Sequence, residues 1–336
     1  MKKSAVILRS VKGADLLHVA EEMLAFCDWE SLLPEGGKVY VKPNLCTDEV
    51  EKVESANTSP ELLEAVCQVL LRRTRDVTIC ESDGARYSAE SAFANTGLEP
   101  VVRRLGVKWV NFSRGEGVSV DHPIFDRYRT GLPKELLDAD LLVNIPVIKT
   151  HALTVFTGSV KNLWGCVPRY DRICMHKYLD ELLSDLVGIL KPRINIMDGI
   201  VGAEGRGPTN GTPRRMDVVL ASRDPVALDA TAMRLVGLDP YAVKHLVLSN
   251  KKGFGSINED GIVIDGDFEK LKVQFIPAAL DWAVWAMNYL TRYRFFVKYI
   301  LFNTFIFRNA RRVVFLLRNV GLLKGSAKGF GSGIGA

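Results

Sequence analysis

Short apolar runs alternate along the chain with stretches whose apolar residues recur every three or four positions. The short runs, rich in Val, Ile and Leu, predict strands at 5–8, 39–41, 77–80, 109–112, 141–145, 194–197 and 218–221. The stretches with helical spacing predict helices at 16–26, 60–72, 89–95, 178–190 and 225–236. Pro60 and Pro225 stand where two of these helices begin, which is where proline is favoured. The alternation predicts an α/β fold, with a parallel or mixed sheet covered by helices on both faces.

A shift in composition near Pro277 divides the chain into three predicted parts. Residues 1–275 form the α/β body, within which no sharp boundary can be placed. Residues 276–324 are crowded with Trp, Tyr, Phe and Arg and predict a basic, amphipathic, helical segment. Residues 325–336 are rich in Gly and Ser and predict a flexible tail.

The positive charge of the chain is concentrated near its C-terminal end. The formal net charge is +5, from 44 Lys and Arg against 39 Asp and Glu. Residues 282–336 hold nine of the basic residues and no acidic one, so residues 1–281 carry 35 basic against 39 acidic residues. A mildly acidic body is a poor candidate for wrapping nucleic acid, and we expect no nucleic-acid partner.

The six cysteines show no paired spacing and lie in or beside apolar runs. This pattern predicts reduced, mostly buried thiols in a cytoplasmic protein. The first residues pass directly into the predicted strand 5–8 with no long apolar stretch, so we expect no secretory signal.

The densest group of candidate site residues follows the predicted strand 141–145. It comprises Asn144, Lys149, His151, Lys161 and Asn162. Ligands bind beyond the carboxyl ends of strands in open α/β sheets, and lysines there attract phosphate or carboxylate groups. We expect His151, Lys149 and Lys161 to be catalytic, with the histidine as acid or base and a desolvated lysine as base or imine-forming nucleophile. The alternative is a polar loop with solvated lysines, in which His151 caps a helix.

Two further groups follow strand ends and are expected to bind substrate with the first. Lys42 and Asn44 follow strand 39–41, and Glu81 and Asp83 follow strand 77–80. Carboxylates that face lysines can perform acid–base chemistry, bind a divalent metal or simply pair with the lysines. For 81–84 a structural turn is the alternative.

The glycine-rich stretch 197–211 is the third group. It offers the carboxylates of Asp198 and Glu204, and the backbone at Gly205 and Gly207 can approach an anion closely. Its G-x-G pattern is followed by prolines and a strand rather than a helix, so we expect no dinucleotide site here. A flexible hairpin is the alternative to an anion site. His176, ahead of helix 178–190, completes the predicted substrate-binding set as either a cap or an acid–base group.

These motifs, in this order, resemble domain-of-unknown-function family 362 (DUF362) over roughly residues 3–270. The residues that carry the resemblance are Val41-Lys42-Pro43-Asn44, Glu81-Ser82-Asp83-Gly84, 144–151, 157–162, 198–211 and 224–230. The family is largely uncharacterised. Many of its relatives carry a ferredoxin-like segment with cysteine-ligated iron–sulfur clusters, which implies redox roles. This chain lacks the cysteine runs for a cluster of its own.

A second similarity is to the nickel-pincer lactate racemases. The order Lys149-Thr150-His151, Lys161 and Gly165-Cys166-Val167-Pro168 is similar to their central motif, in which the lysine anchors the cofactor and the histidine serves the metal. The chain departs from them at 81–84, which offers no histidine, so the nickel cofactor is not carried over. The similarity implies a two-lobed α/β fold with a pocket between the lobes.

Two functions compete on these observations. The first is an enzyme that binds an anionic small molecule or cofactor between lobes, with isomerase-like or redox-associated chemistry. The second is a non-catalytic redox or metal-associated accessory that docks through its C-terminal segment onto a membrane or a redox partner. The sequence leaves the cofactor, the metal and the substrate unknown.

The C-terminal segment is too often interrupted by charge to span a bilayer. Its longest uncharged stretches, 282–291 and 299–307, are about half of the roughly 20 residues that a spanning helix needs. Aromatic residues and arginines without acids favour an interfacial helix over 282–320, lying on the inner face of the membrane. The alternative is that this segment packs on the body or on a second copy of the chain in a homo-oligomer.

Overall fold

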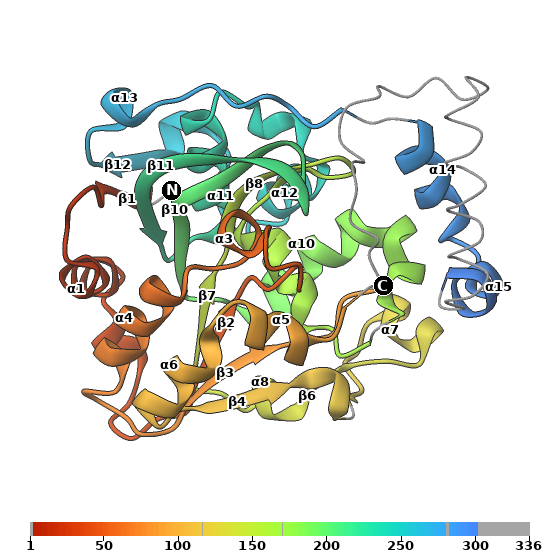
Figure 1. The fold of residues 1–336 in the computed structure, drawn as a ribbon, viewed down its shortest axis with the longest axis horizontal. Coiled ribbons are helices and arrows are strands. Elements are labelled where there is room, and N and C mark those ends of the chain that lie inside the picture. Colours follow the sequence, from red (N-terminus) through yellow and green to blue (C-terminus); the bar gives the residue numbers. More distant parts are fainter. Residues whose placement is uncertain (1–2, 86, 116, 170, 280–281, 302–336) are drawn as a thin grey trace.

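The computed structural model describes residues 3–85, 87–115, 117–169, 171–279 and 282–301. A mixed ten-stranded sheet runs through the body, with helices on both sides (Figure 1). Its strand order is β12-β1-β11-β10-β7-β2-β3-β4, and β8 pairs with both β10 and β9. The predicted α/β fold with a mixed sheet is therefore confirmed.

The strands of the large sheet are β1 (Ser4–Ser10), β2 (Val39–Pro43), β3 (Val77–Glu81), β4 (Lys108–Asn111), β7 (Leu141–Ile145), β8 (Val147–His151), β9 (Val155–Thr157), β10 (Ile194–Arg206), β11 (Asn210–Ser222) and β12 (Ile262–Asp265). A separate two-stranded sheet pairs β5 (Gly117–Val118) with β6 (Leu132–Pro133). Strands β10, β7, β2, β3 and β4 run parallel to one another, and β11 runs antiparallel to both β10 and β1.

The α-helices are α1 (Leu16–Phe26), α2 (Trp29–Leu32), α3 (Val53–Ala56), α4 (Pro60–Leu70), α5 (Ala89–Asn95), α6 (Leu98–Leu105), α7 (Pro123–Tyr128), α8 (Lys134–Leu137), α9 (Ser159–Asn162), α10 (Leu179–Leu190), α11 (Pro225–Leu235), α12 (Lys244–Lys251), α13 (Phe268–Leu271), α14 (Trp282–Leu290) and α15 (Arg294–Phe296). The shorter helical turns are η1 (Phe112–Arg114), η2 (Leu163–Cys166), η3 (Arg172–Tyr178), η4 (Pro240–Ala242), η5 (Glu259–Gly261) and η6 (Val297–Leu301).

Helix starts follow the chemistry that the sequence predicts. The Ser59 side chain accepts a hydrogen bond from Leu62 N at the start of α4, and Asp224 accepts from Val226 N and Ala227 N at the start of α11. Each cap satisfies backbone N–H groups that have no partner inside the helix. A proline then occupies the first helical turn in both helices, as predicted.

Alternate residues of the central strands pack into two apolar layers, one on each face of the sheet. On β2, Val39 and Val41 pack with the layer that contains α1 and α4, whereas Tyr40 packs with the layer that contains α10 and α11. Because both faces of the sheet are covered, the whole of β2 is buried. The side chains at the carboxyl ends of the parallel strands are consequently enclosed by the body.

The predicted ends of three strands were wrong. The strand at 141–145 was expected to end at Pro146, but residues 147–151 continue the sheet as β8. The strands at 194–197 and 218–221 are longer than predicted, and most of residues 198–211 belong to the long hairpin of β10 and β11, as in the hairpin alternative. Pro146 interrupts only one step of the sheet, because its carbonyl accepts a hydrogen bond from Asp198 N at 2.8 Å and β10 pairs with β8 beyond it.

The N-terminal strand β1 lies between strands from the far end of the body. It pairs antiparallel with β11, with Val6 opposite Ser222, and parallel with β12, with Ser4 opposite Ile262. Beyond β12 and α13, Val273 N and Phe275 N donate to the carbonyls of Leu235 and Val236 at the end of α11. Through these hydrogen bonds, the residues that lead from the body to the C-terminal segment are bound to the body.

The C-terminal segment begins with α14, α15 and η6 at one end of the molecule, close to α7 (Figure 1). No helix within the described residues is long and apolar enough to cross a membrane. The rest of the predicted amphipathic segment and the predicted tail, residues 302–336, lie outside the described residues.

Candidate functional site

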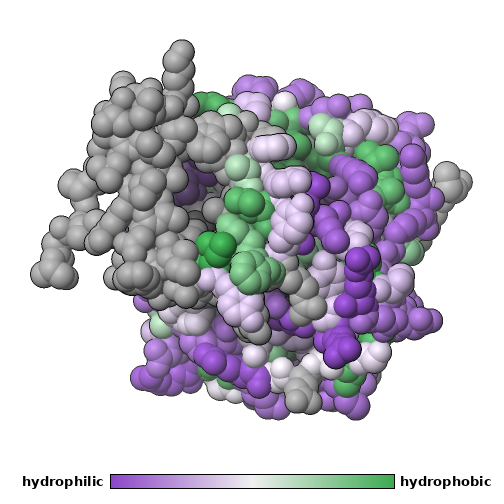
Figure 2. Space-filling model, turned by 90° about the vertical axis from the view of Figure 1, so that its right-hand side faces the viewer, coloured by the Kyte–Doolittle hydropathy of each residue, from purple (hydrophilic) through white to green (hydrophobic). Residues whose placement is uncertain are grey.

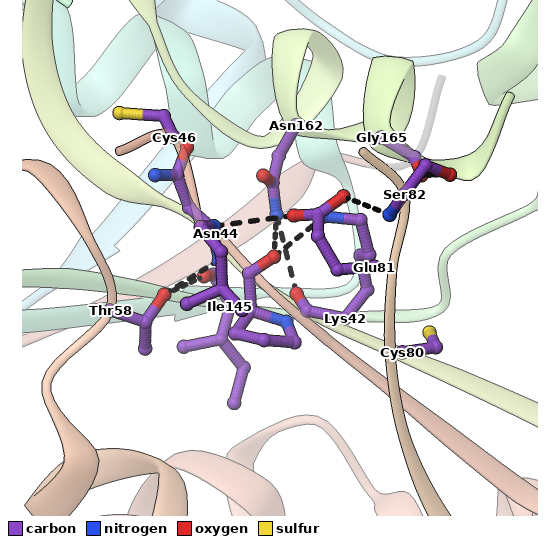
Figure 3. A network of polar contacts seen from close by, with 12 residues as sticks. Lys42, Asn44, Cys46, Thr58, Cys80, Glu81, Ser82, Ile145, Asn162 and Gly165 are labelled. Carbon is purple, nitrogen blue, oxygen red and sulfur yellow. Dashed lines mark hydrogen bonds and ion pairs between the residues drawn. The ribbon is translucent and has the colours of Figure 1, made fainter. Parts of the chain in front are cut away.

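Lys42 and Glu81 form a buried ion pair at the carboxyl ends of the neighbouring strands β2 and β3. Lys42 Nζ donates to Glu81 Oε2 and to the carbonyl of Pro43, both at 2.6 Å (Figure 3). The same carboxylate accepts from Leu45 N at 3.2 Å and from Ser82 N at 2.9 Å. Four hydrogen bonds therefore satisfy two groups that have lost their water, which is the condition for burying an ion pair.

Gly165 packs directly against this ion pair. A Cβ atom added there would lie 2.6 Å from Lys42 Cε and 2.7 Å from Lys42 Nζ, and closer still to a Glu81 oxygen. The Gly165 carbonyl accepts a hydrogen bond from Ser82 Oγ at 2.6 Å, which attaches η2 to the end of β3. Only glycine leaves room for the pair at this place.

A chain of asparagine side chains connects the ends of β2, β7 and β10. Asn162 Nδ2 donates to Asn144 Oδ1 at 2.8 Å. It also reaches the carbonyls of Lys42 (Figure 3) and Pro43 at 3.3 Å. Asn144 Nδ2 in turn donates to Asn195 Oδ1 at 3.0 Å. These amides are buried and hydrogen-bonded to one another, so they hold the strand ends together.

Lys149 points from β8 toward the segment that follows β2. Its Nζ donates to the carbonyl of Ala56 at 2.5 Å and lies 3.1 Å from Cys46 Sγ. Asn44 Nδ2 donates to the same Ala56 carbonyl at 2.7 Å. Lys149 is fully buried, yet its partners in the described residues are neutral.

Lys161 lies on the short helix α9, whose first turn is fixed by a buried carboxylate. Asp229 on α11 accepts hydrogen bonds from Ser159 N at 2.5 Å and Val160 N at 3.0 Å, and burial raises its pKa to about 7. Lys161 itself is half-buried and forms no hydrogen bond or ion pair with any described residue. Burial, with the positive charges of Arg172 and Lys149 nearby, lowers the pKa of the Lys161 amine to about 7.

Arg172 and His176 belong to η3 and lie close enough to Lys161 on α9 to interact with it electrostatically. Arg172 is buried and donates to the carbonyls of Val167 and Arg169 at 3.2 and 3.1 Å. Burial and the positive charges of Lys161 and Arg172 lower the pKa of His176 to about 3. The His176 ring is therefore neutral at physiological pH, and it lies 5.9 Å from the Trp164 ring.

His151 ends β8 with its ring oriented by the backbone. Its Nδ1 accepts hydrogen bonds from Leu153 N at 3.0 Å and Thr154 N at 3.3 Å. Burial, followed by the positive charge of Lys161, lowers the pKa of His151 well below its usual value. Because Nδ1 is an acceptor, the single ring proton is on Nε2, and His151 is a neutral hydrogen-bond donor at that atom.

Lys149, Lys161 and Arg172 thus concentrate positive charge near His151 and His176. None of the three cations pairs with a carboxylate of the described residues. Glu81 is the carboxylate that acts most strongly on Arg172, and it is already paired with Lys42. We name Lys149, Lys161, Arg172, His151 and His176 the cationic cluster. An arrangement of this sign is suited to an anion.

The remaining predicted site residues have other contacts. Asp83 accepts from Ala89 N and from Asn111 Nδ2, both at 2.8 Å, which fixes the turn before α5. Asp198 accepts from Ser59 N at 2.8 Å and Ile200 N at 3.0 Å, and burial raises its pKa to about 6. Both carboxylates accept from backbone N–H groups, and Asp83 also from a side-chain amide, whereas neither forms an ion pair with a predicted lysine within the described residues.

The tip of the β10–β11 hairpin lies against the end of β8. Gly205 O accepts from Thr150 Oγ1 at 3.0 Å, and Gly207 approaches the Thr150 carbonyl so closely that a side chain would not fit. Glu204 Oε2 accepts from Ile276 N at 3.0 Å, which attaches the C-terminal connection. Cys46 Sγ reaches the Pro208 carbonyl at 3.8 Å, so the hairpin tip borders the Lys149 contact.

Sequence reasoning missed Arg172 and Asp229 as site residues. Arg172 stands four residues before His176, and Asp229 is the one acidic residue within the apolar helix α11. A carboxylate inside an apolar helix signals a buried partner, but the sequence does not reveal that the partner is α9. No group of three or more His, Cys, Asp or Glu side chains among the described residues is placed to hold a metal ion.

Comparison with known proteins gives two matches. The family model "Domain of unknown function (DUF362)" matches residues 39–234, which contain the whole cationic cluster. The chain is also 31% identical over 263 residues to a protein of Synechocystis sp. named as a thylakoid-associated protein. That alignment covers 75% of this chain and 80% of the relative.

Proposed function

The chain belongs to the DUF362 family, whose description assigns no reaction, and we therefore propose a function from its own side chains. We propose that the cationic cluster binds a small organic anion, a carboxylate or a phosphate ester, and moves a proton to or from it. One observation carries this proposal: Lys149, Lys161 and Arg172 converge without a carboxylate partner in the described residues.

Binding of an anion would offset the free-energy cost of burying these three cations near one another. Burying cations near one another without a counter-charge is unfavourable, and the lowered pKa of Lys161 reports that cost. A carboxylate or phosphate in contact with Lys161 and Arg172 would restore the protonated amine. The site would therefore bind an anion together with a proton when the pH lies above about 7.

Within this proposal the two kinds of side chain have different roles. Lys161 is the proton carrier, because an amine with a pKa of about 7 has both of its forms populated near neutral pH. His151 donates from Nε2–H to an oxygen of the bound anion and stabilises charge there. Arg172 binds and orients the anion, since a guanidinium presents several donors in one plane.

Thermal unfolding in the presence of small anions tests the proposal. The probes are inorganic phosphate and short mono- and dicarboxylates, each compared with chloride at equal ionic strength. A site that is saturated at about one hundred times Kd raises Tm by roughly 5 °C for a chain of this size. Lys161→Met should abolish the rise, whereas Lys12→Met, an exposed lysine beside α1, should retain it.

The result that contradicts the proposal is equally clear. Either no anion raises Tm above the chloride control, or the Lys161→Met variant shows the same rise as the unaltered chain. In both cases the cationic cluster is structural.

We propose a second function, peripheral association with a membrane. The observation that favours it is the run of exposed aromatic side chains over α14 to η6, among them Trp285, Tyr289 and Phe295. The name of the Synechocystis relative, a thylakoid-associated protein, supports it as well. This function is compatible with the first, because a site in the body and a docking face at its end can serve one protein.

Co-sedimentation of the full chain with vesicles tests this second function. Membrane association requires that the chain sediment with vesicles of equal parts phosphatidylcholine and phosphatidylglycerol. Replacing Trp285, Tyr289 and Phe295 with serine should abolish sedimentation, because exposed aromatic side chains supply the apolar contact. A chain that stays in the supernatant with every vesicle has no such function.

A further inference from the structure

We propose that a cavity between the body and the C-terminal segment binds the phosphate headgroup of an anionic membrane lipid. The inference rests on the proposed membrane association and adds the lipid chemistry and its site. The cavity has a volume of about 330 Å³. It is lined by Arg127, Tyr128, Lys177, Arg292, Tyr293 and Phe295.

Three separate elements each bring one cation to this cavity. Arg127 comes from α7, Lys177 from η3 and Arg292 from the turn that follows α14. None of the three forms an ion pair with a carboxylate in the parts of the chain that the structure describes. A cavity with three cations and no counter-charge is complementary to a phosphate.

Aromatic rings position these cations without neutralising them. The Arg127 guanidinium carbon lies 5.9 Å from the centre of the Tyr178 ring, and Lys177 Nζ lies 4.7 Å from the centre of that ring. The Arg292 guanidinium carbon lies 5.6 Å from the centre of the Tyr289 ring. Arg127 Nη1 also donates to the Tyr178 hydroxyl at 2.9 Å. The cation–π contacts themselves occupy none of the other N–H donors, which can therefore bind a phosphate.

The surface around the cavity favours a lipid over a soluble phosphate. On the face that carries α14 and α15, apolar and weakly polar residues gather in one patch (Figure 2). Phe295, which lines the cavity, is 69% exposed, and Trp285 on the same segment is 59% exposed. Tyr293 and Tyr299 are also exposed, at about half of their surface. Amphipathic rings of this kind favour the headgroup region of a bilayer, where lipid phosphates lie beside them.

Local charge points to the same occupant. Residues 282–301 contain Arg292, Arg294 and Lys298 and no acidic residue. Each basic residue that lies within a Debye length of an anionic bilayer strengthens the binding of the protein to that bilayer about fivefold. The aromatic patch and the cavity therefore act on one surface, with the rings in the headgroup layer and the cations on its phosphates.

The test compares two triple variants of the full chain on two kinds of vesicle. Arg127→Gln, Lys177→Gln and Arg292→Gln together remove the cavity cations. Lys3→Gln, Lys12→Gln and Arg75→Gln together remove the same charge from exposed positions beside β1, α1 and α4, away from α14 and α15. The vesicles are phosphatidylcholine alone, and equal parts phosphatidylcholine and phosphatidylglycerol.

We expect the unaltered chain to prefer the vesicles that contain phosphatidylglycerol. The cavity variant should lose that preference, by about fivefold for each cation removed, while its weaker binding to phosphatidylcholine persists through the aromatic residues. The control variant should keep most of the preference. Circular dichroism and Tm should show that both variants fold, since the exchanged side chains are exposed.

Other outcomes would contradict either the membrane association or the cavity site. If the unaltered chain ignores both vesicles, the membrane function itself is wrong. If it binds but the two triple variants behave alike, membrane association stands and the cavity site is wrong. If glycerol 3-phosphate or an acidic peptide releases the chain from the vesicles at equal charge concentration, the cavity serves a soluble ligand instead.

Discussion

Lys42 Nζ lies 2.6 Å from Glu81 Oε2, although the two side chains are only 0% and 4% exposed. Each charge is satisfied by the other and by nearby backbone groups. The free energy of such a pair depends on both partners being present, because removing one leaves a buried charge without compensation. Substitutions of Lys42 and Glu81 therefore measure how much the pair contributes to the stability of the protein.

Lys42→Met should destabilise the protein by about 3–5 kcal/mol, since it leaves the Glu81 carboxylate buried and unpaired. Lys42→Met combined with Glu81→Gln should recover part of that loss, because the amide carries no charge to desolvate. Urea unfolding of the two variants measures both values. A double variant that is no more stable than Lys42→Met would show that the loss comes from packing.

Gly165→Ala should destabilise the protein by a similar amount. The added methyl group would overlap with both members of the ion pair, and neither can move without losing a backbone partner. Gly115→Ala is the matched control, because a Cβ there meets nothing closer than 3.8 Å. Its free energy of unfolding should change by about 0.5 kcal/mol or less. Equal effects of the two substitutions would contradict the assignment of Gly165.

Anion binding by the cationic cluster should weaken as the pH rises through about 7. Lys161 has its pKa lowered to about 7, so the free site loses one positive charge in this range. Calorimetric titration with inorganic phosphate at about pH 6 and about pH 9 should show about tenfold weaker binding at the higher pH, after correction for phosphate ionisation. The Lys161→Arg variant should keep its affinity at the higher pH, because arginine stays charged.

The stability of the protein should depend on pH through Asp229. Its pKa is raised to about 7 in the folded protein, so ionisation is less favourable in the folded than in the unfolded chain. The stabilisation is complete below about pH 4 and is lost as the pH rises toward about 7, by on the order of a few kcal/mol. His151 and His176 have lowered pKa values and act in the opposite direction. The difference between the unaltered chain and Asp229→Asn therefore isolates this carboxylate.

Unfolding of both proteins at about pH 5 and about pH 8 measures this difference. Asp229→Asn is expected to be less stable at both values, because an amide accepts from only one of the two N–H groups that start α9. Its loss should be smaller at the higher pH. A difference that is independent of pH would sink the assignment of Asp229 as the titrating group.

Cys46 should react first with iodoacetamide. It is half-buried, whereas Cys27, Cys67, Cys80, Cys166 and Cys174 are buried. Burial also raises the pKa of Cys27, Cys67 and Cys166 to about 12, which suppresses their thiolates. Peptide mass spectrometry of a time course should show Cys46 alkylated before any of the five others. Simultaneous labelling would indicate that the body opens as a whole.

The sequence predicts the elements whose signals are local. Ser59 and Pro60, like Asp224 and Pro225, announce a helix start through a cap and a fixed φ angle, and the structure has both helices. The six cysteines were expected to be reduced and mostly buried. All six are free thiols, and Cys46 is the half-buried exception.

The sequence fails where a distant residue decides the local conformation. Pro146 ends an apolar run and predicts the end of the strand, but β10 continues alongside and pairs with β8 on the other side of it. The predicted strand 194–197 also stops too early, because Gly199 and Gly202 belong to β10, where Val218 and Phe275 approach too closely for a side chain. The lysines and histidines of the site could be predicted from their positions after strands. The sequence does not show that Glu81 pairs with Lys42 and with no other lysine of the site, which is what separates the ion pair from the cationic cluster.

The position of β1 between β11 and β12 sets an order of events on the ribosome. The partners of β1 are made only after about 200 further residues, so this strand emerges well before them and must wait on the order of tens of seconds at ordinary rates of synthesis. Strands β2, β3 and β4 can pair with one another much earlier. The apolar edge formed by residues 5–8 would meanwhile be exposed to solvent or to chaperones. Nascent chains stalled before β11 should therefore be the most prone to aggregate.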